Sequence, residues 1–202
     1  MSTTIAIAES TSFAHDVAVY VDRMRQFSRH DWLVYTAWVG LMCGLTATTT
    51  SFLVYGSLHG ARFPGDAWLV PVGAAAFTIA IAVDTIGHLT IYKEEIKRAE
   101  ALVHHVTIAA GVASCVFLCA AYGEPAVFTI PALVATILSF VYSLVDEAFH
   151  WRRYVSASSD RVEMWSHVLI LSGHATMMIA WWHWFLLGYP GVGDTLSAWQ
   201  TA

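Results

Sequence analysis

The chain has 202 residues, which is enough for one domain. Hydrophobic residues make up 57% and charged residues only 12%, whereas an average soluble domain carries about 25% charged residues. The mean hydropathy is +0.57, and the net charge of -5 comes without any basic stripe. This composition favours a bilayer protein over an ordinary soluble domain, and nothing in the charge pattern indicates nucleic-acid binding. We expect one all-α, membrane-embedded helical domain over residues 1–202.

The first predicted element is an amphipathic helix near the N-terminus. Apolar side chains recur there at helical spacing, with charged residues between them. They are Phe13, Val17, Tyr20, Met24 and Phe27. Such a pattern predicts a helix that lies on the inner membrane surface. The alternative is a helix packed against the bundle or against a partner.

Five apolar runs follow, and each approaches the roughly 20 residues that cross a bilayer. They cover residues 32–56, 67–83, 106–123, 126–145 and 165–188. The second run is short and reaches full length only if residues 84–88 continue the helix. We therefore expect a polytopic bundle of about five transmembrane helices.

The basic residues predict how this bundle is oriented. If the N-terminus is cytoplasmic, nine of the ten basic residues fall on the cytoplasmic side and Arg62 falls on the other. The nine are Arg23, Arg25, Arg29, Lys93, Lys97, Arg98, Arg152, Arg153 and Arg161. This asymmetry is typical of multi-pass proteins of the cell (inner) membrane.

One motif of ionisable residues occurs twice. Each copy has an Asp, a His four residues later and a second His seventeen residues after the first. The two sets are Asp84, His88 and His105, and Asp146, His150 and His167. A Val-x-Ile-x-x-Gly pattern follows the last His of each set. The pattern predicts an internal two-helix repeat, with copies at about 67–123 and 126–188, that brings both sets to the cytoplasmic end.

The residue types in these sets point to metal chemistry. An Asp and a His four residues apart project from one face of a helix. Two imidazoles and one carboxylate around an open face form the ligand set of non-haem Fe(II) oxygenases, and facing helices supply the ligands in di-iron bundles. We therefore expect two metal ions, iron in the first instance and copper as the alternative. The other interpretation is that these groups cap helices or pair at the membrane interface.

Several neighbouring residues could alter this ligand set. His104 is a substitute for His105 if the repeat is shifted by one residue, and this shift also aligns Glu100 with Glu163. Glu147 follows Asp146 and points about 100° away on a helix, so we expect one of the two to bind metal. For His174 an axial ligand, a hydrogen-bond donor to a ligand and a satisfied interior histidine all stay open.

The doublet resembles the C subunit of the copper membrane monooxygenases that oxidise methane and ammonia. The segment from Asp84 through Gly-His88 to the Glu-Glu pair before Ile96 is similar to part of that family. The resemblance implies copper sites at the six residues of the doublet. The chain departs from the family in a longer spacing to the second His and in placing the motifs at the cytoplasmic end. A looser similarity of architecture and ligand type links it to haem-oxygenase-like di-iron oxidases.

Together these patterns favour a membrane oxidoreductase that activates O2 at a dinuclear non-haem iron site to oxidise a C–H bond. The expected partners are O2, an apolar or small organic substrate, and an electron donor or partner subunits. A copper monooxygenase-like subunit keeps the same ligands. A metal or proton transporter would use the same Asp/His cluster for a passing cation, and an assembly subunit would use it for a structural metal.

Overall fold

The computed structural model describes residues 12–91, 93, 98–157 and 161–201. All regular structure in these ranges is helical. The α-helices are α1 (Phe13–Asp22), α2 (Arg29–Leu58), α3 (Leu69–Thr90), α4 (Arg98–Ala120), α5 (Pro125–Ala157), α6 (Arg161–Leu186) and α7 (Val192–Thr201). Two 3₁₀ turns, η1 (Arg23–Gln26) and η2 (Gly65–Trp68), precede α2 and α3. The all-α fold expected from the sequence is confirmed.

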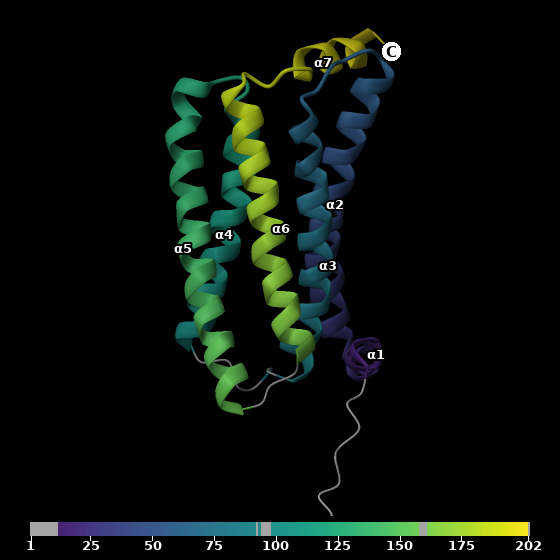
Figure 1. Ribbon diagram of the computed structural model, residues 1–202, viewed down its shortest axis with the longest axis vertical. Coiled ribbons are helices and arrows are strands. Elements are labelled where there is room, and N and C mark those ends of the chain that lie inside the picture. The colour runs from purple at the N-terminus through teal and green to yellow at the C-terminus, as the bar shows by residue number, and fades with distance from the viewer. Residues whose placement is uncertain (1–11, 92, 94–97, 158–160, 202) are drawn as a thin grey trace, which may run out of the picture.

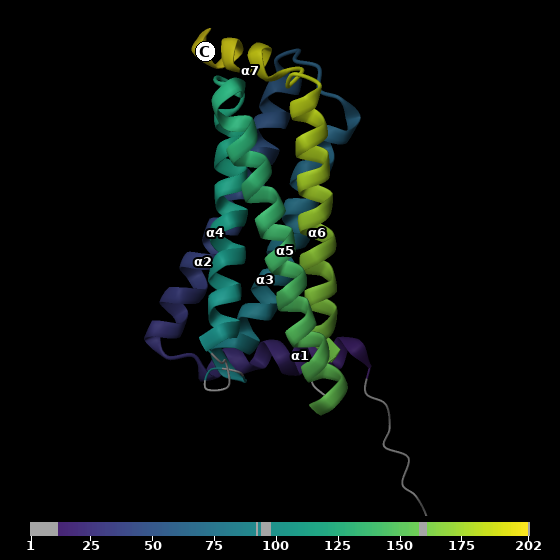
Figure 2. The same cartoon turned by 90° about the vertical axis from the view of Figure 1, so that its left-hand side faces the viewer.

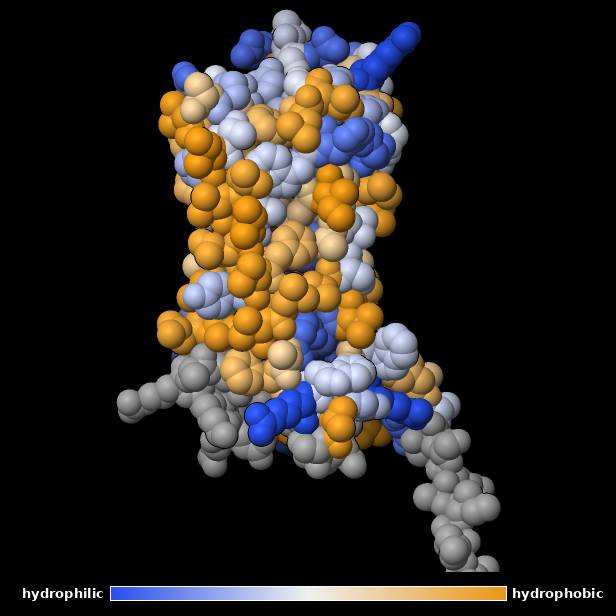
Figure 3. Space-filling view, turned by 60° about the vertical axis from the view of Figure 1, so that its left-hand side comes forward, coloured by the Kyte–Doolittle hydropathy of each residue, from blue (hydrophilic) through white to orange (hydrophobic). Residues whose placement is uncertain are grey.

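Four helical segments are long and apolar enough to cross a membrane. They are Arg29–Leu58, Gly65–Thr90, Leu102–Ala120 and Pro125–Arg152. The fifth predicted span corresponds to α6, which is 26 residues long but is not among the four. Histidine, serine and tryptophan residues interrupt its apolar sequence. Hydrophobic side chains cover the middle of the face in Figure 3 and hydrophilic ones gather at its two ends, as a membrane-embedded protein requires.

The five long helices run side by side, and the two short ones cross their ends (Figures 1 and 2). α1 crosses the end where α3 and α5 finish, and α7 crosses the opposite end. The most extensive helix contacts join α4 to α5 and α3 to α6, while α2 packs mainly on α3. The bundle therefore consists of two closely packed helix pairs, and α2 packs against the α3–α6 pair.

A polar cap fixes the start of α2. The Ser28 hydroxyl accepts from the backbone N–H of Asp31, and the Asp31 carboxylate accepts from the backbone N–H of Ser28. This reciprocal capping box satisfies two N–H groups that the first turn leaves without partners. Lys93 donates to both Asp31 oxygens, at 2.7 and 2.9 Å, and so ties the start of α2 to the residues after α3.

The predicted amphipathic helix is α1 with its 3₁₀ extension, and it packs on the bundle. Tyr20 is fully buried and belongs to a small apolar cluster with Ile86 and Val162. Asp16 pairs with Arg161 at the start of α6. The opposite face of α1 stays exposed. Of the two interpretations, packing against the bundle is confirmed, and the exposed face is compatible with a membrane surface as well.

Two glycines set how closely α3 and α6 approach. A Cβ on Gly73 would collide with the backbone of Met177, and one on Gly173 would lie 2.7 Å from the backbone N of Phe77. No side chain can occupy either position without separating the helices. The contact lies near the larger apolar core, which includes Leu53, Leu118 and Trp181.

We expect Gly73→Ala to destabilise the protein by about 1–3 kcal/mol, because the added methyl group has no free volume. Gly111→Ala is the matched control, since nothing lies within 4 Å of a Cβ at that position. The measurement is thermal denaturation in detergent, followed as loss of the monodisperse protein. Equal melting temperatures for the two variants would contradict the close approach of α3 and α6.

Candidate metal centre

Five of the six ionisable residues of the doublet, all but His105, meet at the end of the bundle that α1 crosses, and His104 joins them. α3 and α5 bring their Asp and His residues to this end, and α4 and α6 begin here. Because each Asp precedes its His by one helical turn, both side chains of a pair face the same neighbours. The cluster comprises Asp84, His88, His104, Asp146, Glu147, His150, Glu163 and His167.

The pair α3–α6 supplies the first half of the cluster. Asp84 is 3% exposed. Its Oδ1 atom lies 3.0 Å from Nε2 of His167, and its Oδ2 atom lies 3.3 Å from Nε2 of His88. One carboxylate therefore faces two imidazoles, one from its own helix and one from α6.

The pair α4–α5 repeats this arrangement more loosely. Asp146 Oδ2 lies 3.5 Å from Nδ1 of His104, and Asp146 Oδ1 lies 3.9 Å from Nε2 of His150. Again one carboxylate faces an imidazole of its own helix and one from the paired helix. In both halves a histidine near the start of one helix, α6 or α4, faces the Asp near the end of the paired helix, α3 or α5.

The two halves are in direct contact. The rings of His150 and His167 stack with centroids 3.7 Å apart. The ring centroids of His88 and His104 are 5.0 Å apart. One ring nitrogen from each of His88, His150 and His167 lies within 4.8 Å of the other two. A single ion or a close pair of ions could therefore be shared by ligands from three helices.

Two glutamates support the imidazoles from behind. Glu147 Oε1 lies 3.0 Å from Nδ1 of His167, and Glu163 Oε1 lies 2.9 Å from Nδ1 of His150. A carboxylate that accepts the Nδ1 proton fixes the tautomer in which Nε2 has a free lone pair, an arrangement that metal-ligating histidines commonly show. The sequence set Glu147 and Asp146 as alternatives for one role, but the structure gives each a different partner.

Two buried atoms at the centre form no hydrogen bond with the residues that the structure describes. They are Nε2 of His150 and Oδ1 of Asp146. Buried polar atoms are seldom left without a partner because desolvation then goes uncompensated. These atoms belong to the ligand types that bind iron, copper and zinc. The residues present therefore fit a metal ion.

Membership of His105 in the ligand set stays a prediction, but the structure favours its neighbour His104. His105 is exposed, whereas the half-buried His104 faces Asp146 and His88. The Val-x-Ile-x-x-Gly pattern favoured His105, but the helices pack in the register shifted by one residue, in which His104 corresponds to His167. The Glu100 side chain lies outside the part of the chain that the structure describes.

His174 lies deeper in the bundle than the other histidines. It is 5% exposed, and its ring stacks on Phe140 at 4.5 Å and on Phe77 at 5.5 Å. Its side chain forms no hydrogen bond with the described residues. The role of His174 among the three alternatives stays a prediction. His174 lines a cavity of about 460 Å³, and Asp84 and His167 line it as well. The sequence patterns did not predict this cavity.

Comparison with known proteins adds no assignment. No protein-family model, curated protein or solved structure matches the chain. The resemblance to the copper monooxygenase subunit stays an expectation from the sequence.

We expect His104→Ala to lower the affinity for a bound transition metal by at least about tenfold, and His105→Ala to leave it unchanged. The two neighbours form a matched pair because His104 faces Asp146 and His88, whereas His105 is exposed. Metal per chain is measured by elemental analysis after purification, with chromatography as the folding control. Loss of metal in the His105 variant alone would overturn the assignment of His104.

Proposed function

We propose that the protein is a membrane-embedded oxidoreductase with a dinuclear non-haem iron site that activates O2 to oxidise a C–H bond. The observation that carries the proposal is the convergence of four imidazoles and two aspartates at one buried point beside an apolar cavity. The metal ligands in this proposal are Asp84, His88, His104, Asp146, His150 and His167.

A bound metal is favoured because burying these carboxylates and imidazoles without a cation costs free energy. Burying an ionised carboxylate requires a compensating charge or hydrogen bonds, and Asp146 Oδ1 has no hydrogen bond with any residue in the described ranges. Stacking His150 on His167 at 3.7 Å is unfavourable if both rings are protonated. A bound metal resolves both problems, since neutral imidazoles and anionic carboxylates are its preferred ligand forms.

Two ions are favoured over one by the duplication. Each half offers one carboxylate and two imidazoles. Exchanging the two repeat copies would convert the α3–α6 pair into the α4–α5 pair. This is the relation that a pseudo-twofold axis along the bundle would impose. It supports the two-helix repeat with copies at about 67–123 and 126–188.

Iron is favoured over copper by the ligand types. Carboxylates mixed with imidazoles suit Fe(II), and two-His, one-carboxylate sets leave positions for O2. When bound, an iron pair supplies the electron transfer that reduces O2. The balanced reaction inserts one oxygen atom into a C–H bond and releases the other as water. It consumes two electrons and two protons, which a reduced electron donor provides.

The chain's own groups have separate tasks in this proposal. The aspartates offset the charge of the ions, and Glu147 and Glu163 hold the tautomers of His167 and His150. The apolar cavity keeps water from the reacting carbon. With the N-terminus in the cytoplasm of a cell with an inner membrane, the centre lies near the cytoplasmic surface, within reach of a soluble electron donor.

Elemental analysis of the purified protein tests the proposal. We expect about two iron atoms per chain, lost in both Asp84→Ala and Asp146→Ala. Asp66→Ala is the control, because Asp66 pairs with His183 at the opposite end of the bundle. The iron-loaded protein should also consume O2 when a reductant is supplied.

Other outcomes separate the alternatives. Stoichiometric copper in place of iron would support the copper monooxygenase-like subunit. Absence of any retained metal, with cation flux through proteoliposomes that Asp84→Ala abolishes, would overturn the oxidoreductase in favour of a transporter.

A further inference from the structure

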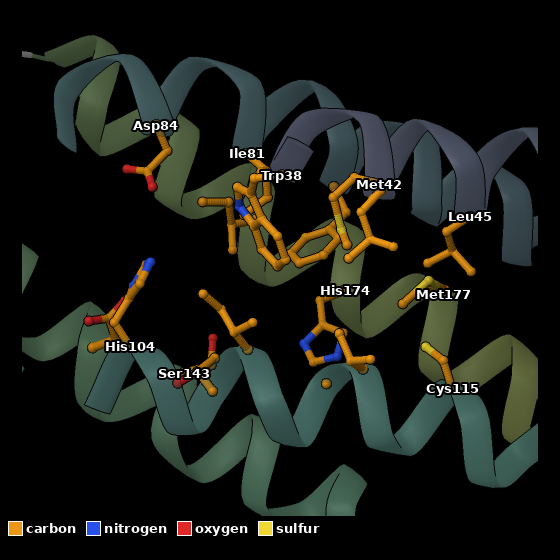
Figure 4. Close-up of a pocket in the computed structure, with 18 of the residues that line it drawn as sticks. Trp38, Met42, Leu45, Ile81, Asp84, His104, Cys115, Ser143, His174 and Met177 are labelled. Carbon is orange, nitrogen blue, oxygen red and sulfur yellow. The ribbon is translucent and has the colours of Figure 1, made fainter. Parts of the chain in front are cut away.

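The cavity beside the cluster extends along the bundle axis, away from the end that α1 crosses. Asp84 and His104 lie at one end of it, and Leu45 and Cys115 lie toward the other (Figure 4). Its volume of about 460 Å³ is within the range of small-molecule sites. Apart from the cluster, its walls are mostly aliphatic, aromatic and sulfur-containing side chains.

The cavity opens sideways between α2 and α4. Side chains on its rim are largely exposed, with exposed fractions of 51% for Leu41 and 57% for Val116. Gly44 on α2 and Gly111 on α4 both line it, and a Cβ at either position would meet no atom within 4 Å. Because both helices are long and apolar enough to span a membrane, a bilayer around the bundle would place this opening in its hydrocarbon region.

His174 is the side chain whose presence a purely apolar cavity would not explain. Its imidazole is 5% exposed, lines the cavity and forms no hydrogen bond with any described residue. The hydroxyls of Thr48 and Thr107, which also line the cavity, already donate to carbonyls of their own helices. The ring nitrogens of His174 are not among the buried atoms that lack a partner, so they are open to the cavity and can hydrogen-bond a ligand there.

The position of His174 also sets a length. It follows His167 by seven residues on α6, which places its backbone about 10 Å farther along the helix at 1.5 Å per residue. A ligand that contacts both the cluster and His174 must therefore be elongated. The missing side chains at Gly44 and Gly111 leave room for a thin chain between the helices.

We propose that the cavity binds a linear alkyl chain that bears one hydrogen-bonding group, such as a long-chain alcohol or carbonyl compound. It enters from the bilayer between α2 and α4. His174 hydrogen-bonds the polar group, and the chain extends from there to the cluster. This substrate class rests on the proposed function in so far as the chain carbon at the cluster is the one oxidised. The binding itself requires no metal.

The experiment uses the full chain in lipid nanodiscs, stripped of metal by a chelator. The probes are a photoactivatable 12-carbon alcohol and the matching photoactivatable alkane without the hydroxyl. Labelled peptides are mapped by mass spectrometry, and apparent affinities come from competition with unlabelled 1-dodecanol or dodecane. We expect the label on the segments of α2 and α4 that line the cavity.

Variants separate the two parts of the proposal. Gly111→Leu fills the cavity and should weaken both probes strongly, while Ile137→Leu on the exposed face of α5 should change neither. His174→Phe keeps the ring stacking but removes the hydrogen bond. It should weaken the alcohol roughly 2- to 10-fold and spare the alkane. His174→Gln, which can donate and accept, should restore part of the loss.

Each failure has a distinct meaning. Unchanged labelling in Gly111→Leu and in a second filling variant, Gly44→Leu, would overturn the cavity as the binding site. Equal effects of His174→Phe on both probes would overturn the assigned polar contact. Because the protein is metal-free throughout, an absence of iron would sink the proposed oxidoreductase without affecting these results.

Discussion

The contact between Asp84 and His167 is the constraint on which the centre depends. It joins α3 to α6 at a separation of 3.0 Å, and the glycine contact at Gly73 and Gly173 brings the same two helices together closer to the middle of the bundle. A buried carboxylate must have a partner. Rotation or sliding of α6 would therefore leave Asp84 without its contact to His167. The imidazole of His167 in turn stacks on His150 and places the second half beside the first.

Membrane helices gain little from hydrophobic attraction to one another, because lipid is as apolar as their side chains. Close packing at small residues and polar contacts must then hold the bundle together. This chain uses both: glycines where α3 meets α6, and an acid–imidazole network at one end. The network that favours a metal site therefore also holds the helices in register.

Much of this arrangement follows from the sequence. The Asp-x-x-x-His spacing fixed the shared helix face, and the duplication predicted that the two sets would meet. The choice between His104 and His105 did not follow, because neighbouring residues on a helix differ by about 100° and only packing decides which one faces inward. The contact of Glu163 with His150 joins different helices, so its spacing to His167 gave no signal for it. The cavity depends on how α2 packs against the bundle, and the periodicity of the sequence does not predict that packing.

The contact between Asp84 on α3 and His167 on α6 has a consequence for biogenesis. Helices enter the membrane in order of synthesis, and Asp84 is already inserted when α4 and α5 emerge from the ribosome. Its partner His167 belongs to α6, which is the last of the long helices to be made. Before α6 is inserted, Asp84 has the imidazole of His88 from its own helix but lacks that of His167. A site that needs His167 can form only after α6 is in place, so a chain truncated before α6 leaves Asp84 without that contact.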